Sequence, residues 1–137
     1  MAAPESKPRP APIPTTKPFW DGLNEDKVRL QHCAECGAWV YYPRRRCPSC
    51  LSPALDWREV SGRGHIYSWT VGRQATHPAF AEDVPQFLAV VELAEGVRMT
   101  TTIVDAEEGD LVVGRAVEPV FEHGADGMTL LHFRPSA

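Results

Sequence analysis

The stretches LQHCAECG (30–37) and PRRRCPSC (43–50) decide the fold, because they contain every cysteine of the 137-residue chain. Each stretch holds one C-x2-C pair, and ten residues separate the two pairs: Cys33, Cys36, Cys47 and Cys50. A C-x2-C pair on a tight turn aims two sulfurs at one point, and two facing turns supply a tetrahedral four-thiolate cage. Gly37 allows the first turn to close with a positive φ. We therefore predict a zinc ribbon over residues 31–60 with one structural zinc ion, because four thiolates leave no coordination position open.

Two disulfides are the alternative use of these four cysteines. The first residues lack the apolar run and cleavage site of a secretory signal, so we expect a cytoplasmic, reducing compartment, which disfavours disulfides. A thioredoxin-like redox pair would need a βαβ context, which the sequence around the cysteines does not suggest. His32 beside Cys33 is a competing metal ligand, but four sulfurs already suffice.

Five strand-like segments follow the cysteines and are separated by glycine-rich turns: 65–72, 87–93, 97–104, 116–122 and 128–133. Several short strands with such turns in about 70 residues predict a small closed β-barrel over residues 61–137. No helix of ten residues is expected in this half. The chain is therefore predicted to be mostly β.

Residues 1–18 carry six of the thirteen prolines and almost no large apolar side chain. Such a composition predicts a disordered, extended leader, or a linker from a larger protein. Residues 19–30 begin with apolar side chains at helical spacing, namely Phe19, Trp20 and Leu23. A helix of one or two turns is not stable alone, so we predict a docking helix that packs on this domain's own core or on a partner.

Charge is divided by region within a net charge of −4. Residues 27–64 hold seven Lys or Arg and three Asp or Glu, net +4, whereas residues 65–137 hold four and eleven, net −7. The basic segment includes four candidates for anion contact, Arg44, Arg45, Arg46 and Arg63, since arginine pairs bidentately with phosphate. An ordinary solvated surface is the alternative. No apolar run reaches the roughly 20 residues that a membrane helix needs.

Catalytic signatures are missing from the sequence. The five histidines form no metal-binding pattern, and no nucleophile elbow, P-loop or dinucleotide-binding motif occurs. The carboxylates near residues 105–110 suit a solvated loop. We therefore predict no catalytic residue in this chain.

The order of these parts resembles the acyl-CoA-associated OB-fold family with a rubredoxin-like zinc ribbon. The resemblance covers residue 18 to the end. Beyond the two cysteine stretches it rests on FWDGL (19–23), SGRGHIYSWTV (61–71), AVVELAEGVRMTTTIV (89–104), VGRAVEPVFE (113–122) and LHFRP (131–135). It implies that the barrel is an OB-fold.

Members of that family accompany thiolase-superfamily proteins: thiolases, condensing enzymes and lipid-transfer-protein-type aldolases that cleave steroid side chains carried as CoA thioesters. Some are fused to MaoC-like hydratases. The resemblance thus implies a non-catalytic accessory subunit in steroid or lipid metabolism, most simply of such an aldolase, or else of a thiolase or acyltransferase. It also implies that the four arginines attract the CoA phosphates and that the chain guides the CoA arm.

Two rival hypotheses remain. Zinc-ribbon and OB-fold modules also bind single-stranded nucleic acid on basic, aromatic grooves, but a barrel with a net charge of −7 repels phosphates. The chain could instead be an acyl-CoA enzyme by itself, which turnover by the purified protein would reveal.

Overall fold

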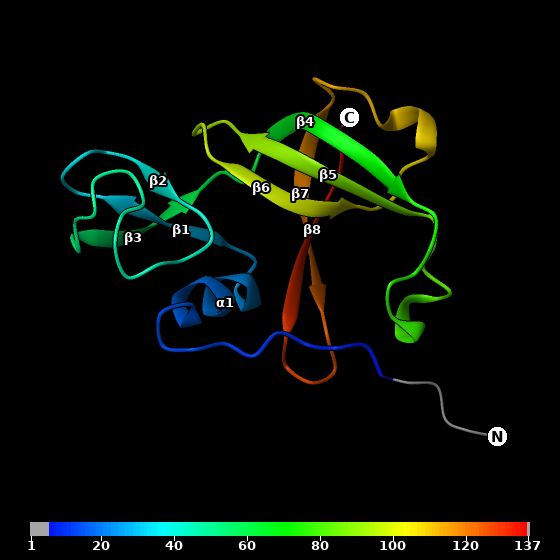
Figure 1. Cartoon of the computed structure of the whole chain (residues 1–137), viewed down its shortest axis with the longest axis horizontal. Coiled ribbons are helices and arrows are strands. Elements are labelled where there is room, and N and C mark those ends of the chain that lie inside the picture. Colours follow the sequence, from blue (N-terminus) through cyan, green and yellow to red (C-terminus); the bar gives the residue numbers. More distant parts are fainter. Residues whose placement is uncertain (1–5, 137) are drawn as a thin grey trace.

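A small ribbon sheet and a barrel follow one another along the chain, with one helix beside them (Figure 1). This computed structural model describes residues 6–136. The ribbon sheet has the strand order β2-β1-β3, with β1 at Val28–Cys33, β2 at Trp39–Val40 and β3 at Leu55–Val60. Both of its strand pairs are antiparallel.

The barrel closes in the order β4-β5-β6-β8-β7. Its strands are β4 (Gly64–Gly72), β5 (Gln86–Leu93), β6 (Arg98–Ile103), β7 (Ala116–His123) and β8 (Thr129–Pro135). Two single 3-10 turns, η1 (Pro78–Phe80) and η2 (Glu108–Asp110), lie in its loops. The predicted mostly-β class, with a short helix, a four-cysteine ribbon and a small barrel, is confirmed. The first and last residues of each predicted barrel strand lie within two residues of those of an observed strand.

Helix α1 covers Lys17–Asn24 and is shorter than the predicted helix of residues 19–30. It begins earlier because Pro18 suits the first turn, where no backbone donor is needed. It ends because Asp26 adopts a left-handed φ of 59°. Residues 28–30, which the sequence analysis assigned to the helix, are strand β1.

Residues 6–13 of the proline-rich leader form no helix or strand and run past the tip of the β7–β8 hairpin (Figure 1). The Arg9 guanidinium donates to both carboxylate oxygens of Asp126, at 2.8 and 3.1 Å, and lowers the pKa of that carboxyl. The Lys7 ammonium lies 2.6 Å from an Asp83 oxygen. Residues 14–16 of the predicted disordered leader form a turn, and residues 17–18 begin α1. Residues 1–5 of the leader lie outside the described residues.

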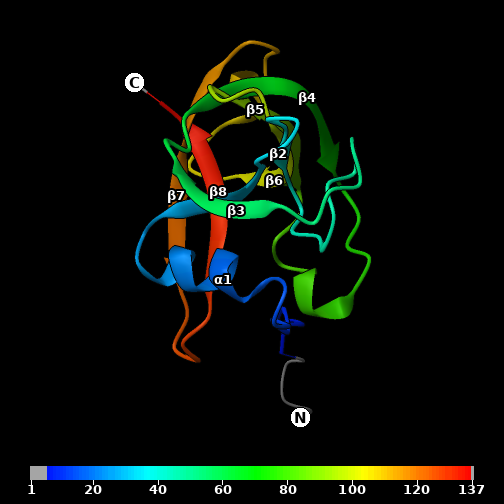
Figure 2. The same ribbon diagram turned by 90° about the vertical axis from the view of Figure 1, so that its left-hand side faces the viewer.

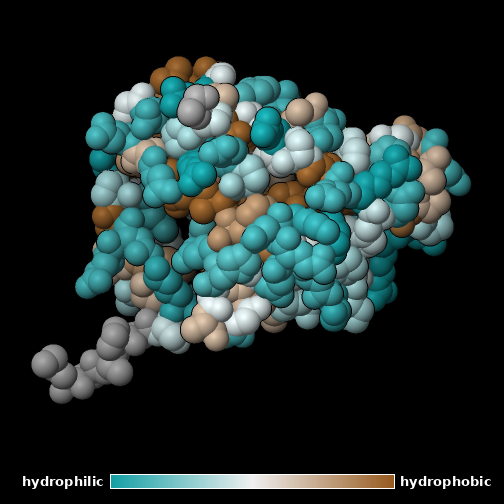
Figure 3. Space-filling view, turned by 180° about the vertical axis from the view of Figure 1, so that it is seen from behind, coloured by the Kyte–Doolittle hydropathy of each residue, from teal (hydrophilic) through white to brown (hydrophobic). Residues whose placement is uncertain are grey.

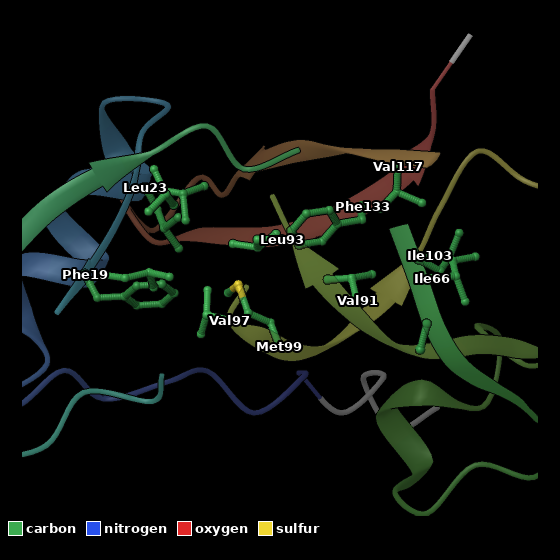
Figure 4. Close-up of a cluster of buried hydrophobic side chains, with 14 of the residues drawn as sticks. Phe19, Leu23, Ile66, Val91, Leu93, Val97, Met99, Ile103, Val117 and Phe133 are labelled. Atoms are coloured by element: carbon green, nitrogen blue, oxygen red, sulfur yellow. The ribbon is translucent and has the colours of Figure 1, made fainter. Parts of the chain in front are cut away.

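One hydrophobic cluster joins all three parts of the molecule (Figure 4). Phe133 and Val91 lie in its barrel portion, Phe19 and Leu23 come from α1, and Leu30 comes from β1. Figure 2, viewed from the ribbon side, shows the ribbon sheet lying across the barrel with α1 beneath it. The ribbon therefore buries the apolar face of β1 against the barrel and the helix, because its own strands are too short to form a core.

The barrel is closed by only a few paired residues at two places, between β4 and β7 and between β6 and β8. β4 pairs with β7 through Gly64 and His65, and at Gly64 it also lies very close to the backbone of β5 on its other side. β6 pairs with β8 through the single parallel pair Ile103 and Phe133. The remaining ladders, β4–β5, β5–β6 and β7–β8, are longer and antiparallel.

We expect the close approach at Gly64 to make it intolerant of a side chain. A Cβ there would lie 2.9 Å from the Glu92 carbonyl carbon and 2.9 Å from the Leu93 Cα, both backbone atoms. Gly64→Ala should therefore lower the free energy of unfolding by about 2 kcal/mol, measured by urea denaturation. The matched control is Gly72→Ala in the same strand, where the nearest atom lies at 3.7 Å. An equal effect of both substitutions would contradict this account.

Candidate metal centre and docking helix

The four cysteine sulfurs converge on one point, although they come from two separate turns. The Sγ atoms of Cys33 and Cys50 lie 3.5 Å apart, as do those of Cys36 and Cys47. All four ligand atoms lie within 4.8 Å of one another. Four thiolates at metal–sulfur distances of about 2.3 Å in a tetrahedron have sulfur–sulfur edges of about 3.8 Å. The donor set thus fits one tetrahedral metal ion, and none of the four cysteines is in a disulfide.

Each cysteine turn is closed by its own backbone. The Gly37 amide donates to the Cys33 carbonyl at 2.9 Å, and the Leu51 amide donates to the Cys47 carbonyl at 2.8 Å. Both residues have positive φ, 76° at Gly37 and 65° at Leu51. The second turn therefore carries a leucine, 68% exposed, in a conformation that favours glycine.

Backbone amides also stabilise negative charge on the two buried sulfurs. The amide of Cys36, followed by that of Glu35, lowers the pKa of Cys33. The amide of Cys50, followed by that of Ser49, lowers the pKa of Cys47 to about 6. Thiolates, not thiols, bind metal, so the folded turns favour the ligand form at these two sulfurs before any ion is bound. The hydrogen bonds from the Ala38 and Ser52 amides are outweighed by burial and contacts with the other sulfurs at Cys36 and Cys50, so the pKa values of these two cysteines are raised.

The predicted anion-binding arginines lie in two places. Arg44, Arg45 and Arg46 are exposed on the loop that leads into the second cysteine turn, and Arg63 is exposed between β3 and β4. That loop is anchored by the buried Gln31 side chain, which accepts from the Arg44 amide and donates to the Arg44 carbonyl, both at 2.8 Å.

Arg46 has a role that the sequence analysis missed. Its guanidinium donates to the Leu51 carbonyl at 3.1 Å, so it supports the second cysteine turn. The side chains of Arg44 and Arg45 are exposed. The spacing of Arg46 from Leu51 did not signal this contact, because the turn had to be known first.

The three predicted docking residues divide into two groups. Phe19 and Leu23 are 2% and 0% exposed and belong to the protein's own core. Trp20 is half-buried, packs edge-on against Phe19 with ring centres 5.1 Å apart, and donates from its indole N–H to the Tyr42 hydroxyl at 2.9 Å. Of the two alternatives for this helix, its own core therefore takes Phe19 and Leu23, and Trp20 keeps an accessible surface.

A polar cluster that the sequence analysis missed ties α1 to the β7–β8 hairpin. His123 lies between Asp26, with Nε2 2.6 Å from Oδ1, and Thr129, with Nδ1 2.9 Å from Oγ1. The buried Thr129 hydroxyl also donates to Asn24 Oδ1 at 2.6 Å. Asp26 and His123 are 97 residues apart, so no local pattern could pair them.

Comparison with known proteins decides the family. Residues 20–56 match the rubredoxin-like zinc ribbon domain of ChsH2, and residues 57–122 match the C-terminal OB-fold domain of ChsH2. The chain belongs to the ChsH2 family. This confirms the resemblance, and it identifies the barrel of this ChsH2-family chain as an OB-fold.

Relatives differ in length. The chain is 38% identical to a DUF35 domain-containing scaffold protein of Methanocaldococcus jannaschii, over 70% of this chain and 71% of that protein. It is 34% identical to a probable enoyl-CoA hydratase alpha subunit of Thermomonospora curvata, over 95% of this chain but only 40% of that protein. It is 30% identical to the 3-oxo-4,17-pregnadiene-20-carboxyl-CoA hydratase alpha subunit of Mycobacterium tuberculosis and spans 37% of it.

Solved structures agree with the family. A chain of the Ltp2-ChsH2(DUF35) aldolase superposes with a TM-score of 0.81 and 31% identity, over 94% of this chain and 100% of that one. A DUF35-family protein of Sulfolobus solfataricus has a TM-score of 0.64 at 16% identity, which shows a shared fold only. Residues 6–136 of the chain contain no helix of the length and hydrophobicity that crossing a membrane requires.

We expect the ribbon to depend on its metal. Removal of the ion by a strong chelator should unfold residues 28–60, because metal binding at such a site is coupled to folding. Cys47→Ser should reduce bound metal and lower the melting temperature, whereas Ser49→Ala in the same turn changes no ligand and should leave both unchanged. The measurements are metal content by elemental analysis and melting by circular dichroism. An unchanged melting curve after confirmed loss of metal would refute this dependence.

Proposed function

We propose that this chain is a non-catalytic accessory subunit of a thiolase-superfamily partner, most specifically of a lipid-transfer-protein-type aldolase. The observation that carries the proposal is the match to a chain of the Ltp2-ChsH2(DUF35) aldolase over that chain's whole length. The archaeal relative is named a scaffold protein, which favours a structural role over a catalytic one.

In the proposed complex the partner performs the chemistry. A retro-aldol cleavage of a β-hydroxyacyl-CoA needs a general base for the hydroxyl proton and an oxyanion site for the developing enolate. We assign both groups to the partner subunit. The acyl group proposed is a steroid side chain, which would place the complex in cytoplasmic steroid degradation and lipid metabolism.

The metal proposed for the four-cysteine site is a single structural zinc ion. Four thiolates are the typical donor set of structural zinc, and they leave no position for substrate or water. Cys33, Cys36, Cys47 and Cys50 would hold the ion. In this proposal the metal orders the loop that bears the arginines.

The arginines are proposed to attract the phosphates of CoA. Arg44 and Arg45 are exposed beside the metal site, Arg46 is partly committed to the Leu51 carbonyl, and Arg63 lies on the junction between ribbon and barrel. A basic surface on an acidic chain concentrates anionic ligands near one end of the molecule. The CoA arm would then pass along this chain toward the partner's catalytic site.

The first experiment is co-expression with the thiolase-like protein encoded nearest to this chain. We expect a mixed complex on size-exclusion chromatography, with its mass determined by light scattering. The complex should cleave β-hydroxyacyl-CoA thioesters, and each protein alone should be less active or less stable. Separate elution of two folded proteins would count against the accessory role.

A second experiment tests contact with CoA. The double variant Arg44→Gln and Arg45→Gln should raise the KM of the complex for acyl-CoA about three- to tenfold with little change in kcat, since it removes ground-state binding. The matched control is the double variant Arg73→Gln and Arg134→Gln on the barrel, which removes the same two charges; these guanidinium groups donate to Glu108 at 2.7 Å and to Glu118 at 2.9 Å. If the control raises KM equally, the effect is one of net charge and the assigned contact is wrong.

A hydratase complex is the second candidate. Its support is that two hydratase alpha subunits align over 95% and 86% of this chain. The chain spans about two fifths of each, so the hydratase portion would have to come from another protein, of MaoC-like type. Co-expression with such a protein, followed by an enoyl-CoA hydration assay, distinguishes the two candidates.

A further inference from the structure

We propose that the gap between β6 and β8 receives an extended segment of the partner subunit, which pairs with the free edge of β6 as an added strand. This inference rests on the accessory-subunit function proposed above. It deepens that function by assigning the surface and the backbone chemistry of docking.

The free edge follows from the way the barrel closes. β6 and β8 are joined through Ile103 and Phe133, and from that pair the two strands diverge (Figure 1). The next amide, that of Val104, donates to the Phe133 carbonyl at 2.8 Å. A parallel pair of this phase also uses the Thr102 carbonyl, which faces the Phe133 amide. Residues 98–101 of β6 have no strand partner on this side among the described residues.

The phase of the β5–β6 ladder shows which backbone groups face the gap. The Leu93 amide donates to the Val97 carbonyl at 2.8 Å, so every second residue from Val97 bonds toward β5. Thr100 and Thr102 alternate with these residues, and so does Val104, whose amide bonds to β8. Their N–H and C=O groups therefore point toward β8.

The facing edge of β8 is also unpaired beside the gap. The Gly124 amide donates to the Met128 carbonyl at 2.8 Å, which fixes the β7–β8 ladder. Leu131 then has the phase of Phe133, and its backbone groups point away from β7. An extended chain in the gap would thus have strand edges on both sides.

Side chains around the gap form a groove of about 240 Å³ between the barrel and α1. Its walls combine the threonines of β6 with apolar side chains of α1 and β8, among them Trp20, Leu23, Leu130 and Leu131. It adjoins a larger cavity of about 460 Å³, with which it shares Thr102, Leu130 and His132. Seen from behind, the surface is hollowed on its left side, away from α1 and next to the segment of Lys7 and Arg9, where the larger cavity lies (Figure 3).

These features select the occupant. Unpaired strand edges bind an extended polypeptide through its main chain, and side pockets select its alternate side chains. Apart from His132, the groove is lined by uncharged side chains. We therefore assign it to an uncharged, extended segment with apolar side chains, supplied by the thiolase-like partner.

The test is Thr100→Pro in the complex with the co-expressed partner. Proline removes the N–H that faces the gap but leaves the ladder to β5 intact, as at other edge positions. We expect partner affinity to fall at least about tenfold, the effect of losing a main-chain bond and blocking an added strand. The matched control Thr100→Val keeps the N–H and should bind within about threefold of wild type. Bound metal and the unfolding midpoint establish that each variant is folded.

Hydrogen exchange gives a second readout that needs no variant. The amides of Thr100, Thr102 and Leu131 should exchange more slowly in the wild-type complex than in the free chain. One outcome overturns the strand-addition inference and leaves the accessory function standing: the complex forms, but these amides stay unprotected and Thr100→Pro binds as well as wild type. If no complex forms with wild type, both fall together. Protection by acyl-CoA alone, without the partner, would also overturn the inference, because a small ligand and not a protein segment would fill the gap.

Discussion

Convergence of four thiolates on one point is the constraint on which the ribbon depends. The segment between Cys33, which ends β1, and Cys50 contains one strand of two residues and otherwise only turns and loops, so hydrogen bonding alone would leave it weakly ordered. The sulfurs fix both turns, and Gln31 then anchors the loop between them. Once the end of β1 is fixed, its apolar side chains can reach the core beneath the barrel. The arginine loop is positioned by the same constraint.

The barrel lacks complete strand pairing, and the helix lacks stability of its own, and each part makes up for some of what the other lacks. The barrel closes through few paired residues, two between β4 and β7 and one between β6 and β8. It leaves a strand edge open between β6 and β8. Helix α1 is too short to be stable alone, yet Phe19 and Leu23 pack into the core and line that open side, and the cluster around His123 holds the helix to the hairpin. The result is a molecule whose core is complete but whose sheet is not. This combination suits a protein that works as one part of a larger assembly.

Local sequence pattern predicted the features that local forces determine. The cysteine spacing predicted the metal ligands, and the glycine turns and apolar runs predicted all five barrel strands. The helix boundary was less accurate, because the left-handed turn at Asp26 left no signal stronger than the apolar spacing around it. The pairing of Asp26 with His123 and the contact of Arg46 with Leu51 depend on tertiary structure. The open edge of β6 was likewise beyond prediction, since threonine-rich strands read the same whether or not a neighbour pairs with them.

The single hydrophobic cluster also has an evolutionary consequence. Sequence comparison divides the chain into two recognisable domains that meet between residues 56 and 57, but the side chains of α1, β1 and the barrel bury one another across that boundary. Recombination at this point would release two fragments, each with an apolar face open to water. Ribbon and barrel must therefore be inherited as one cassette, and longer relatives are expected to have gained their additional sequence outside it.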